Sequence, residues 1–330
     1  MRILICDHPD SMAPNHAREE AILRSGLEPA FGPLEVVVLP YQAVEHELFL
    51  AQLEAADALL TGFLPLPADV LRRAPSLRAV SINATGYDNV DLRAAKELGI
   101  AVMCIGEYCT QDVAEHTIAL MLALHRNLKH FWRDVDERAH WSFDSAPPGD
   151  RLTERTLGIV GLGRIGSTVA RMARGLGMRV LATDPFVGAA HAEAVGAELV
   201  SRGELLAASD IVSNHMNATP ENVGYFDAAA FGAMTRRPIF LNTGRGTAVV
   251  EPDLVAALDS GQIRGAGLDV LTDETPALRG HPLTGRANVI LTPHSAFFST
   301  ASIEALVRIS CENLVHHFTG AEDKVFTRVV

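Results

Sequence analysis

The sequence is poor in the features that define several large classes of protein. It contains only four cysteines, none of them in a Cys-x-x-Cys pair, so neither a disulfide-stapled fold nor a cysteine-based metal centre is indicated. No apolar run approaches the roughly 18 residues that a membrane-spanning helix needs. The net charge is −12 and the lysines and arginines are scattered, which argues against a nucleic-acid ligand. We therefore expect a cytoplasmic protein with free thiols, no metal, no membrane association and no nucleic-acid partner.

What the sequence does contain is enough apolar residues to form two packed domains, because 48% of its 330 residues are hydrophobic. Short apolar runs alternate with helical patterns, which is typical of βαβ units and parallel sheets. A first set of predicted strands comprises residues 2–6, 35–39, 58–60, 78–82 and 101–105. A second set comprises residues 157–160, 179–182, 210–213, 238–241, 266–270 and 288–291. The sequence thus predicts an α/β protein with two doubly wound parallel sheets.

Two helical segments indicate how the domains are connected. Residues 113–124 are apolar almost all round, which predicts a long helix buried between domains or at a subunit contact. The C-terminal segment is rich in helix formers around Ile303–Ile309 but too short for a third domain. This helix should therefore pack on the first sheet, which makes the first domain discontinuous. We expect residues 1–105 and 296–330 to form one domain, with residues 106–295 inserted into it.

A glycine fingerprint, Gly161-Leu-Gly-Arg-Ile-Gly166, stands between a predicted strand and a predicted helix. Gly161 permits a tight turn, Gly163 lets the backbone approach a pyrophosphate, and Gly166 lets the helix pack closely on the strand. An acidic residue is expected about 20 residues further on, and Asp184 is found at the end of the next strand. A carboxylate there binds a ribose diol and repels a 2′-phosphate. The pattern therefore predicts a dinucleotide-binding domain that prefers NAD.

Three polar residues, Arg245, Glu274 and His294, follow predicted strands of the second set. Parallel sheets bind ligands beyond the carboxyl ends of their strands, so these side chains should share one edge with the fingerprint. A guanidinium can bind a carboxylate through two hydrogen bonds, and an imidazolium can protonate a developing alkoxide. A carboxylate beside that imidazole favours its charged form. Each residue alone fits a surface arginine, a solvated glutamate or a helix-capping histidine, but together they predict reversible reduction of a 2-oxo acid.

Several further motifs stand in a fixed order along the chain. They are Asn83-Ala-Thr-Gly-Tyr-Asp-Asn-Val-Asp91, Val113-Ala-Glu-His116, Ile159-Val-Gly-Leu-Gly-Arg-Ile-Gly166, Asn242-Thr-Gly-Arg-Gly246, Gly267-Leu-Asp-Val270 and Leu291-Thr-Pro-His-Ser-Ala296. In order and spacing they resemble the D-isomer-specific 2-hydroxyacid dehydrogenase family over nearly the whole chain. The resemblance implies a Rossmann NAD-binding domain inserted into a flavodoxin-like substrate domain. It also implies that Arg245 binds the substrate carboxylate, His294 is the acid/base and Glu274 is its partner.

The resemblance implies further contacts with the cofactor and the substrate. Besides the fingerprint glycines, the residues implied to contact the dinucleotide are Thr85, Thr110, Arg164, Ile165, Asp184, Met216, Thr243, Gly244 and Asp269. Backbone amides of the segment Asn83, Ala84, Thr85 and Gly86 would hold the substrate carboxylate. The segment from His294 to Ser299 is most similar to the C-terminal-binding-protein branch, with Phe297 where that branch has tryptophan.

The side chain of the substrate is expected to meet aromatic groups. The predicted contact loop, residues 61–67, carries Phe63 and no cation, and Ile82 stands where phosphoglycerate dehydrogenases of this family typically have arginine. A phosphate buried there would lack a partner, whereas an apolar group beside Phe63, Tyr108 and Phe297 would be stabilised. We therefore expect medium-sized apolar 2-oxo acids as substrates. Alternatively, Phe63 and Phe297 are core residues or gate the site without touching the substrate.

Two functions from different classes remain open at this point. The favoured one is an NAD-dependent 2-oxo acid reductase that runs in either direction. The alternative is an NAD(H)-sensing, corepressor-like interaction protein with weak dehydrogenase activity. The apolar helix at 113–124 and the tryptophans Trp132 and Trp141, which are expected to be exposed, indicate a homodimer. The sequence leaves open the physiological substrate, the preferred direction, the oligomer number and any regulatory partner.

Overall fold

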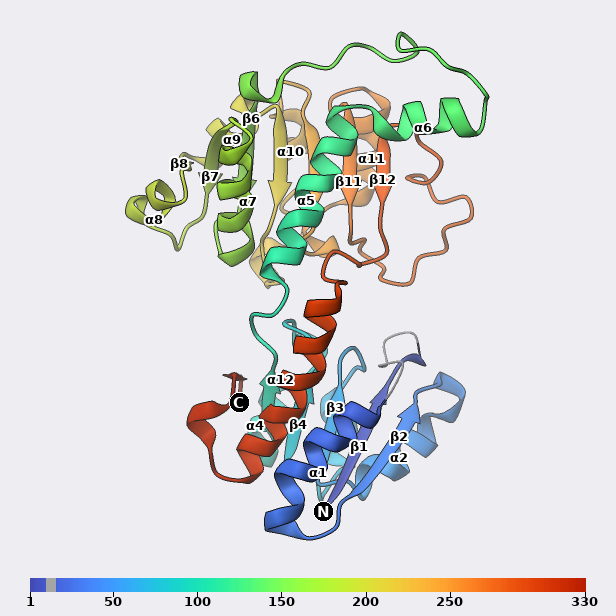
Figure 1. Ribbon diagram of the computed structural model, residues 1–330, viewed down its shortest axis with the longest axis vertical. Helices are drawn as coiled ribbons and strands as arrows, with labels where there is room; N and C mark the ends of the chain where they lie inside the picture. Colours follow the sequence, from blue (N-terminus) through green and yellow to red (C-terminus); the bar gives the residue numbers. More distant parts are fainter. Residues whose placement is uncertain (10–15) are drawn as a thin grey trace. The chain divides into compact units, whose positions relative to one another are not determined.

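The computed structural model describes residues 1–9 and 16–330, and the chain forms two compact units (Figure 1). The first unit consists of residues 1–108 and 299–330, and the second consists of residues 109–298. Each unit has its own sheet and its own hydrophobic cores. The prediction of two parallel-sheet α/β domains, one inserted into the other, is confirmed.

The sheet of the first unit has the strand order β13-β5-β4-β3-β1-β2. Its strands are β1 (Arg2–Asp7), β2 (Glu35–Pro40), β3 (Ala58–Thr61), β4 (Ala79–Ile82), β5 (Ala101–Cys104) and β13 (Thr327–Arg328). The strands β1 to β5 are parallel and match the predicted runs, and their order 2-1-3-4-5 is the flavodoxin-like one. The strand β13 pairs antiparallel with β5. It was missed because two residues are too few for a periodic pattern.

Helices cover the first sheet on both faces. They are α1 (Ala17–Phe31), α2 (His46–Glu54), α3 (Ala68–Arg72), α4 (Leu92–Leu98) and α12 (Thr300–Phe318), with the short 3-10 helices η2 (Ala43–Glu45) and η6 (Glu322–Lys324). The C-terminal helix α12 packs beside α1, and both contribute leucines to one core. A Cβ atom at Gly26 would lie 2.5 Å from Val315, so glycine permits this close approach. The predicted return of the C-terminal helix to the first sheet is confirmed.

The sheet of the second unit is parallel throughout, with the order β12-β11-β10-β9-β6-β7-β8. Its strands are β6 (Thr156–Val160), β7 (Arg179–Thr183), β8 (Glu198–Leu199), β9 (Ile211–Asn214), β10 (Ile239–Asn242), β11 (Gly265–Leu268) and β12 (Val289–Leu291). Counted within the unit, this is the Rossmann order 3-2-1-4-5-6 with one added strand. All but the two-residue β8 were predicted. The strands β6, β9, β10 and β11 are buried along their whole length, which explains their continuous apolar runs.

Helices also cover this second sheet on both faces. They are α5 (Thr110–His125), α6 (Leu128–Asp136), α7 (Arg164–Gly175), α8 (Ala189–Ala194), α9 (Arg202–Ala208), α10 (Ala228–Gly232) and α11 (Glu251–Asp259), with the 3-10 helices η3 (Leu152–Glu154), η4 (Pro220–Asn222) and η5 (Gly246–Ala248). The predicted long helix is α5, which packs on α7, β10 and β11. Its residues Val113, Leu120 and Met121 are buried, whereas Ile118 and Leu122 are only partly covered.

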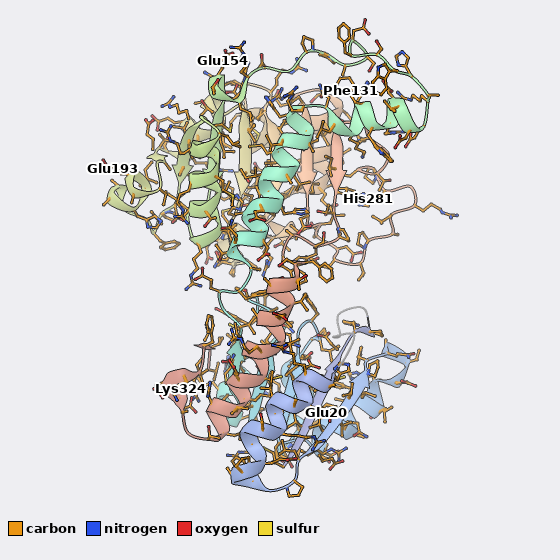
Figure 2. The ribbon with its side chains drawn as sticks, in the orientation of Figure 1. Glu20, Phe131, Glu154, Glu193, His281 and Lys324 are labelled. Carbon is orange, nitrogen blue, oxygen red and sulfur yellow. The ribbon has the colours of Figure 1, made fainter. Side chains whose placement is uncertain are left out.

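The helix α6 and the segment after it carry unusually exposed aromatic side chains. Figure 2 shows Phe131 on α6, and Trp132 follows it with 58% of its surface exposed. Trp141 and Phe143, in the segment after α6, are 88% and 91% exposed. The predicted exposure of both tryptophans is confirmed. Large apolar side chains this exposed are typical of an interaction surface.

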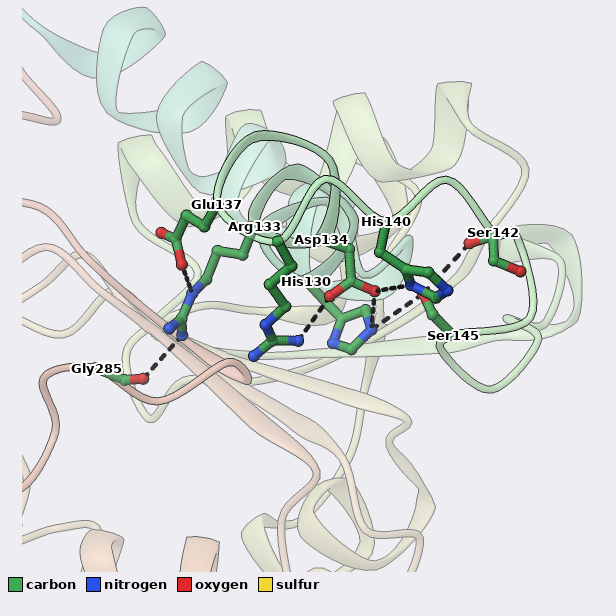
Figure 3. A network of polar contacts seen from close by, with 9 residues as sticks. His130, Arg133, Asp134, Glu137, His140, Ser142, Ser145 and Gly285 are labelled. Atoms are coloured by element: carbon green, nitrogen blue, oxygen red, sulfur yellow. Dashed lines mark hydrogen bonds and ion pairs between the residues drawn. The ribbon is translucent and has the colours of Figure 1, made fainter.

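A buried carboxylate organises the segment that carries these aromatic side chains (Figure 3). Asp134, which is almost fully buried, accepts a hydrogen bond of 2.6 Å from Nη1 of Arg138. The imidazoles of His130 and His140 lie 3.2 and 3.6 Å from its other oxygen. Hydrogen bonds, above all from Ser145, lower the pKa of Asp134 to about 2. Asp134 is therefore ionised at neutral pH and links α6 to the following turn.

In the described part of the chain, no helix combines the length and the apolar character needed to cross a bilayer.

Cys6, Cys104 and Cys311 are buried thiols, and Cys109 is partly exposed. Burial raises the pKa of the Cys6 thiol to about 12, so this group stays protonated at neutral pH.

Candidate active site

The second sheet brings the predicted catalytic residues to one edge. The fingerprint follows β6, Arg245 follows β10, and His294 follows β12. Because these strands are parallel, their carboxyl ends meet at the same edge of the sheet. Glu274 lies in the segment between β11 and β12 and reaches the same edge through its contact with His294.

His294 and Glu274 form a hydrogen-bonded pair. The Nδ1 atom of His294 lies 2.9 Å from Oε2 of Glu274. Their side chains are 33% and 49% exposed, so the pair stays accessible to a ligand. A carboxylate that accepts a hydrogen bond from Nδ1 fixes the orientation of the ring and places Nε2 on its opposite side. The ring of Phe297 stands edge-on to this imidazole, with 6.3 Å between the ring centroids.

The backbone at His294 is held in an unusual conformation. Its φ angle is 48°, in the left-handed region that costs a non-glycine residue about 1–3 kcal/mol. Asp269 holds the turn in place, because its carboxylate accepts hydrogen bonds from the amides of Ser295 (2.9 Å) and Ala296 (3.0 Å) and from the hydroxyl of Thr292 (2.5 Å). The backbone oxygen of Asp269 accepts from the amide of His294 at 2.8 Å.

This turn shows a positioning role for Asp269 that the sequence reasoning missed. The carboxylate is almost fully buried, and its hydrogen bonds are made within the loop. The predicted contact of Asp269 with the dinucleotide stays a prediction. His116 of α5, also missed, joins the same network with its Nε2 atom 3.0 Å from Oγ1 of Thr292. Its place in a family-like motif, Val113–His116, was the one available signal.

Arg245 lies on a tight loop that a buried asparagine holds. The Nδ2 atom of Asn242 donates to the backbone oxygen of Arg245 at 3.0 Å, while its Oδ1 accepts from the amide of Gly244 at 3.1 Å. A Cβ atom at Gly246 would lie 1.9 Å from the backbone oxygen of Leu271, so only glycine fits there. The guanidinium of Arg245 is partly exposed, with Nη1 3.0 Å from the backbone oxygen of Gly244.

The fingerprint has the geometry that a bound dinucleotide requires. Gly161 has a φ angle of 90°, and a Cβ atom there would meet the backbone of His215 at 3.0 Å. A Cβ atom at Gly166 would lie 2.1 Å from the backbone oxygen of Gly161, so the helix α7 approaches the turn closely. Apart from the two chain neighbours of Gly163, no described residue has an atom within 4 Å of its Cβ position. This open backbone at the start of α7 suits a pyrophosphate.

The acidic residue after β7 is also firmly placed. The carboxylate of Asp184 accepts a hydrogen bond from the amide of Leu162 and another from the amide of Phe186, both at 2.8 Å. Next to the turn, burial lowers the pKa of His215 to about 4, so this imidazole is neutral at pH 7. Its Nε2 atom lies 2.8 Å from the hydroxyl of Ser213. The glycine turn and the carboxylate of Asp184 therefore fit an NAD molecule.

The predicted substrate residues are divided between the two units. Phe63, Asn83, Ala84, Thr85, Gly86 and Tyr108 belong to the first unit, and Arg245 and Phe297 belong to the second. Among the residues assigned to the cofactor, Thr85 belongs to the first unit, whereas Thr110, Arg164, Ile165, Met216 and Thr243 belong to the second. Thr243 is buried, and its hydroxyl lies 2.9 Å from that of Thr117.

The loop that carries Phe63 is held by a buried carboxylate. Phe63 is 44% exposed, and Asp7 accepts a hydrogen bond from its amide at 3.1 Å. Burial raises the pKa of Asp7. Sequence reasoning missed Asp7, whose one signal was its position at the end of the first strand. Ile82 is fully buried in the core of the first unit.

A glycine turn at the start of a helix and a hydrogen-bonded pair of histidine and glutamate, both at one edge of a Rossmann sheet, indicate the class of the protein. They are the parts that an oxidoreductase working with a nicotinamide dinucleotide needs. Residues 118–296 match the family model of the D-isomer specific 2-hydroxyacid dehydrogenase NAD-binding domain. The chain belongs to the D-isomer-specific 2-hydroxyacid dehydrogenase family. It is an NAD-dependent oxidoreductase acting on CH–OH groups, and these two predictions are confirmed.

Individual relatives support this assignment. A hydroxypyruvate reductase of Blautia hydrogenotrophica is 34% identical over 86% of this chain and 89% of its own. A glyoxylate reductase of Aeropyrum pernix is 37% identical over 85% of both chains. A phosphoglycerate dehydrogenase of Mycobacterium leprae is 39% identical over 74% of this chain, which spans only 46% of that protein. The crystal structure of an Aquifex aeolicus D-lactate dehydrogenase with NAD and lactic acid matches 99% of both chains, with a TM-score of 0.86 and 26% identity.

Proposed function

We propose that this chain interconverts 2-oxo acids and D-2-hydroxy acids, with the first unit as substrate domain and the second as NAD-binding domain. The observation that carries the proposal is the pair of His294 and Glu274, whose atoms Nδ1 and Oε2 are 2.9 Å apart at the edge that also carries the fingerprint. The hydroxypyruvate reductase, the glyoxylate reductase and the phosphoglycerate dehydrogenase named above are enzymes of small 2-oxo or 2-hydroxy acids, which agrees with the proposal. The similarity to the C-terminal-binding-protein branch stays a prediction.

Each catalytic side chain has a separate task in this proposal. NAD, held by the residues of the second unit, would supply or accept the hydride at C2 of the substrate. In the reductive direction His294 donates a proton from Nε2 to the oxygen on C2, and in the oxidative direction it takes that proton back. Glu274 accepts the hydrogen bond from Nδ1 and stabilises the imidazolium. Arg245 holds the substrate carboxylate through two parallel hydrogen bonds.

The cofactor would be held by residues of the fingerprint turn and its neighbours. The amides at the start of α7 would bind the pyrophosphate, with Gly163 leaving room for its approach, and Asp184 would bind the adenosine ribose. The other proposed contacts are Thr85, Thr110, Gly161, Arg164, Ile165, Gly166, Met216, Thr243, Gly244 and Asp269. The backbone amides of Asn83, Ala84, Thr85 and Gly86 in the first unit are proposed as further contacts of the substrate carboxylate.

The protein should use NAD at least about tenfold more efficiently than NADP, which corresponds to about 1.4 kcal/mol. Two amides fix the carboxylate of Asp184, and residues 180–190 contain no arginine or lysine to neutralise a 2′-phosphate. The measurement is kcat/KM for both cofactors. Asp184→Asn keeps an acceptor for the amide of Leu162 but removes the negative charge. This variant should therefore reduce the ratio of kcat/KM for NAD to kcat/KM for NADP. Equal efficiencies in the parent protein would contradict the assignment of Asp184.

A panel of 2-oxo acids tests the proposed function and its substrate class together. We expect 4-methyl-2-oxopentanoate and phenylpyruvate to exceed glyoxylate and 3-phosphohydroxypyruvate in kcat/KM. The reason is that Phe297 stands beside His294 and Phe63 is partly exposed, and a buried methylene contributes about 0.8 kcal/mol. Phe63→Ala should reduce the advantage of the larger acids while leaving glyoxylate turnover nearly unchanged.

The outcomes of this panel are distinct. If 3-phosphohydroxypyruvate is the best substrate, the aromatic residues do not form the side-chain pocket, although the dehydrogenase function stands. If turnover is feeble on every acid tested, the alternative of an NAD(H)-sensing interaction protein is favoured instead.

We further propose that α6 and the segment after it form the contact of a homodimer. Trp141→Ser combined with Phe143→Ser should shift the protein from dimer to monomer in sedimentation velocity, because both rings are about nine-tenths exposed in the single chain. The matched control is Phe186→Ser, since Phe186 is 94% exposed in the same unit but lies after β7. A parent protein that sediments as a monomer would contradict the proposal.

A further inference from the structure

A charged hollow lies at the edge of the second sheet opposite the candidate active site. It has a volume of about 280 Å³, and its lining residues are Asp150, Arg155, Asp210, Arg236, Arg237 and Arg264. Arg155 immediately precedes β6, Asp210 precedes β9, and Arg264 precedes β11. These strands and β10 are neighbours in the sheet, so the hollow lies across their amino-terminal ends. Glu154, labelled in Figure 2, marks this edge. We call the hollow lined by these six residues the arginine hollow.

Part of the charge in the arginine hollow is neutralised internally. Arg155 bridges two carboxylates, with Nη2 2.6 Å from Asp150 and Nη1 3.1 Å from Asp210. Arg236 lies 3.5 Å from the other oxygen of Asp210. The Nε atom of Arg155 is buried and has no hydrogen-bond partner within the described residues. Both carboxylates are thus used by Arg155 and Arg236.

The other two arginines are not paired with these carboxylates. Nη2 of Arg264 lies 3.3 Å from Nδ1 of His125, whose Nε2 lies 2.8 Å from the backbone oxygen of Asp150. The neutral ring of His125 therefore accepts from Arg264 and offers no negative charge. Burial, followed by repulsion from Arg155, lowers the pKa of Arg264, whereas attraction to Asp150 and Asp210 acts in the opposite direction. Arg237 donates from Nε to the backbone oxygen of Gly261 at 2.7 Å.

The hollow therefore carries more positive than negative charge. Four guanidinium groups face two carboxylates, a surplus of two positive charges, in a chain whose net charge is −12. Keeping cations together without counterions is unfavourable, and guanidinium groups bind phosphate oxygens through paired hydrogen bonds. The volume lies just below the range of roughly 300–1,000 Å³ that is typical of drug-sized ligands, so the hollow suits a smaller molecule.

We propose that the arginine hollow binds a small dianion of phosphate chemistry, either free phosphate or the phosphate group of a small metabolite. Arg237 and Arg264 donate hydrogen bonds to the dianion. Their positive charges, which Asp150 and Asp210 do not neutralise, attract it. The site is separate from the catalytic edge, because its residues lie before the amino-terminal ends of β6, β9, β10 and β11, whereas Arg245 and His294 lie after the carboxyl ends of β10 and β12. Its occupant would stabilise the amino-terminal ends of four neighbouring strands.

Isothermal titration calorimetry of the NAD-saturated, full-length protein tests this proposal. The probes are sodium phosphate, glycerol 3-phosphate and sodium acetate, each at constant ionic strength. We expect phosphate to bind, acetate to bind much more weakly, and Arg264→Gln or Arg237→Asn to weaken phosphate binding about tenfold. Asparagine is chosen at 237 because this residue has a φ angle of 52°, which asparagine tolerates. If glycerol 3-phosphate binds as well as phosphate, the occupant is a phosphorylated metabolite; if it does not bind, the occupant is the free ion.

Two control variants separate the arginine hollow from other sites. Arg179→Gln removes an arginine at the same edge that is paired with Glu198 outside the hollow, and it should leave phosphate binding unchanged. Arg245→Gln shows whether phosphate binds at the catalytic edge instead, because phosphate held there by Arg245 would be lost in this variant. The proposal is overturned if phosphate does not bind, if acetate binds equally well, or if binding is lost in Arg245→Gln but retained in Arg264→Gln and Arg237→Asn.

Discussion

Replacing His294 with alanine is expected to lower kcat about 10²–10⁴-fold in both directions, which is the usual contribution of a positioned general acid or base. In our proposal this imidazole alone moves the proton to and from the substrate oxygen. Steady-state kinetics with the best 2-oxo acid of the panel measures the effect. NAD binding, followed by calorimetry, should be almost unchanged, because the fingerprint lies at a different strand. A variant that keeps more than a tenth of the parental kcat would exclude His294 as the acid/base.

Glu274→Gln provides the matched test of the pair. It keeps a hydrogen-bonding group beside Nδ1 of His294 but removes the negative charge that stabilises the imidazolium. Reduction needs the protonated ring, so its pH profile of kcat/KM should fall off at lower pH than in the parent. Oxidation needs the neutral ring and should reach its plateau at lower pH. A profile identical to that of the parent would remove Glu274 from the mechanism.

Arg245→Ala is expected to raise KM for the 2-oxo acid strongly and to lower kcat as well. The loss of a charge-assisted, two-fold contact with the substrate carboxylate should cost about 3 kcal/mol in kcat/KM, which is more than 100-fold. Arg245→Lys should recover only part of this loss, because an ammonium group lacks the planar pair of donors. The matched control is Arg286→Gln, whose guanidinium is bound to Asp259 on the same unit.

The variants of Arg245 also separate substrate binding from protein stability. The backbone of Arg245 is held by Asn242, so truncating the side chain should leave thermal unfolding nearly unchanged. If KM is unaltered in Arg245→Ala while kcat falls, the guanidinium acts on the reacting carbonyl rather than on the carboxylate. If both constants match the parent, Arg245 has no part in the site.

Much of the candidate site could be predicted because its chemistry is local in the sequence. The turn from Gly161 to Gly166 requires glycines at short, fixed spacings, and Asp184 follows at the distance of one βαβ step. Arg245 and His294 each come just after a strand, where parallel sheets bind ligands. The supporting residues Asp7, His116 and Asp269 were missed or given another role. They act through contacts with segments distant in the sequence, which residue type alone does not reveal.

The strand pattern, the glycine turn and the residue types of the catalytic group were determined by the sequence alone, because periodicity and short spacings encode them. The tertiary structure decided which distant residues meet. Arg155, Arg236, Arg237 and Arg264 are scattered along the chain, and their spacing gave no sign of a basic cluster. They gather because each precedes a strand and those strands are neighbours in a parallel sheet. Strand order is set by the packing of the whole domain, so a charged site at the amino-terminal edge can be recognised only in the folded protein.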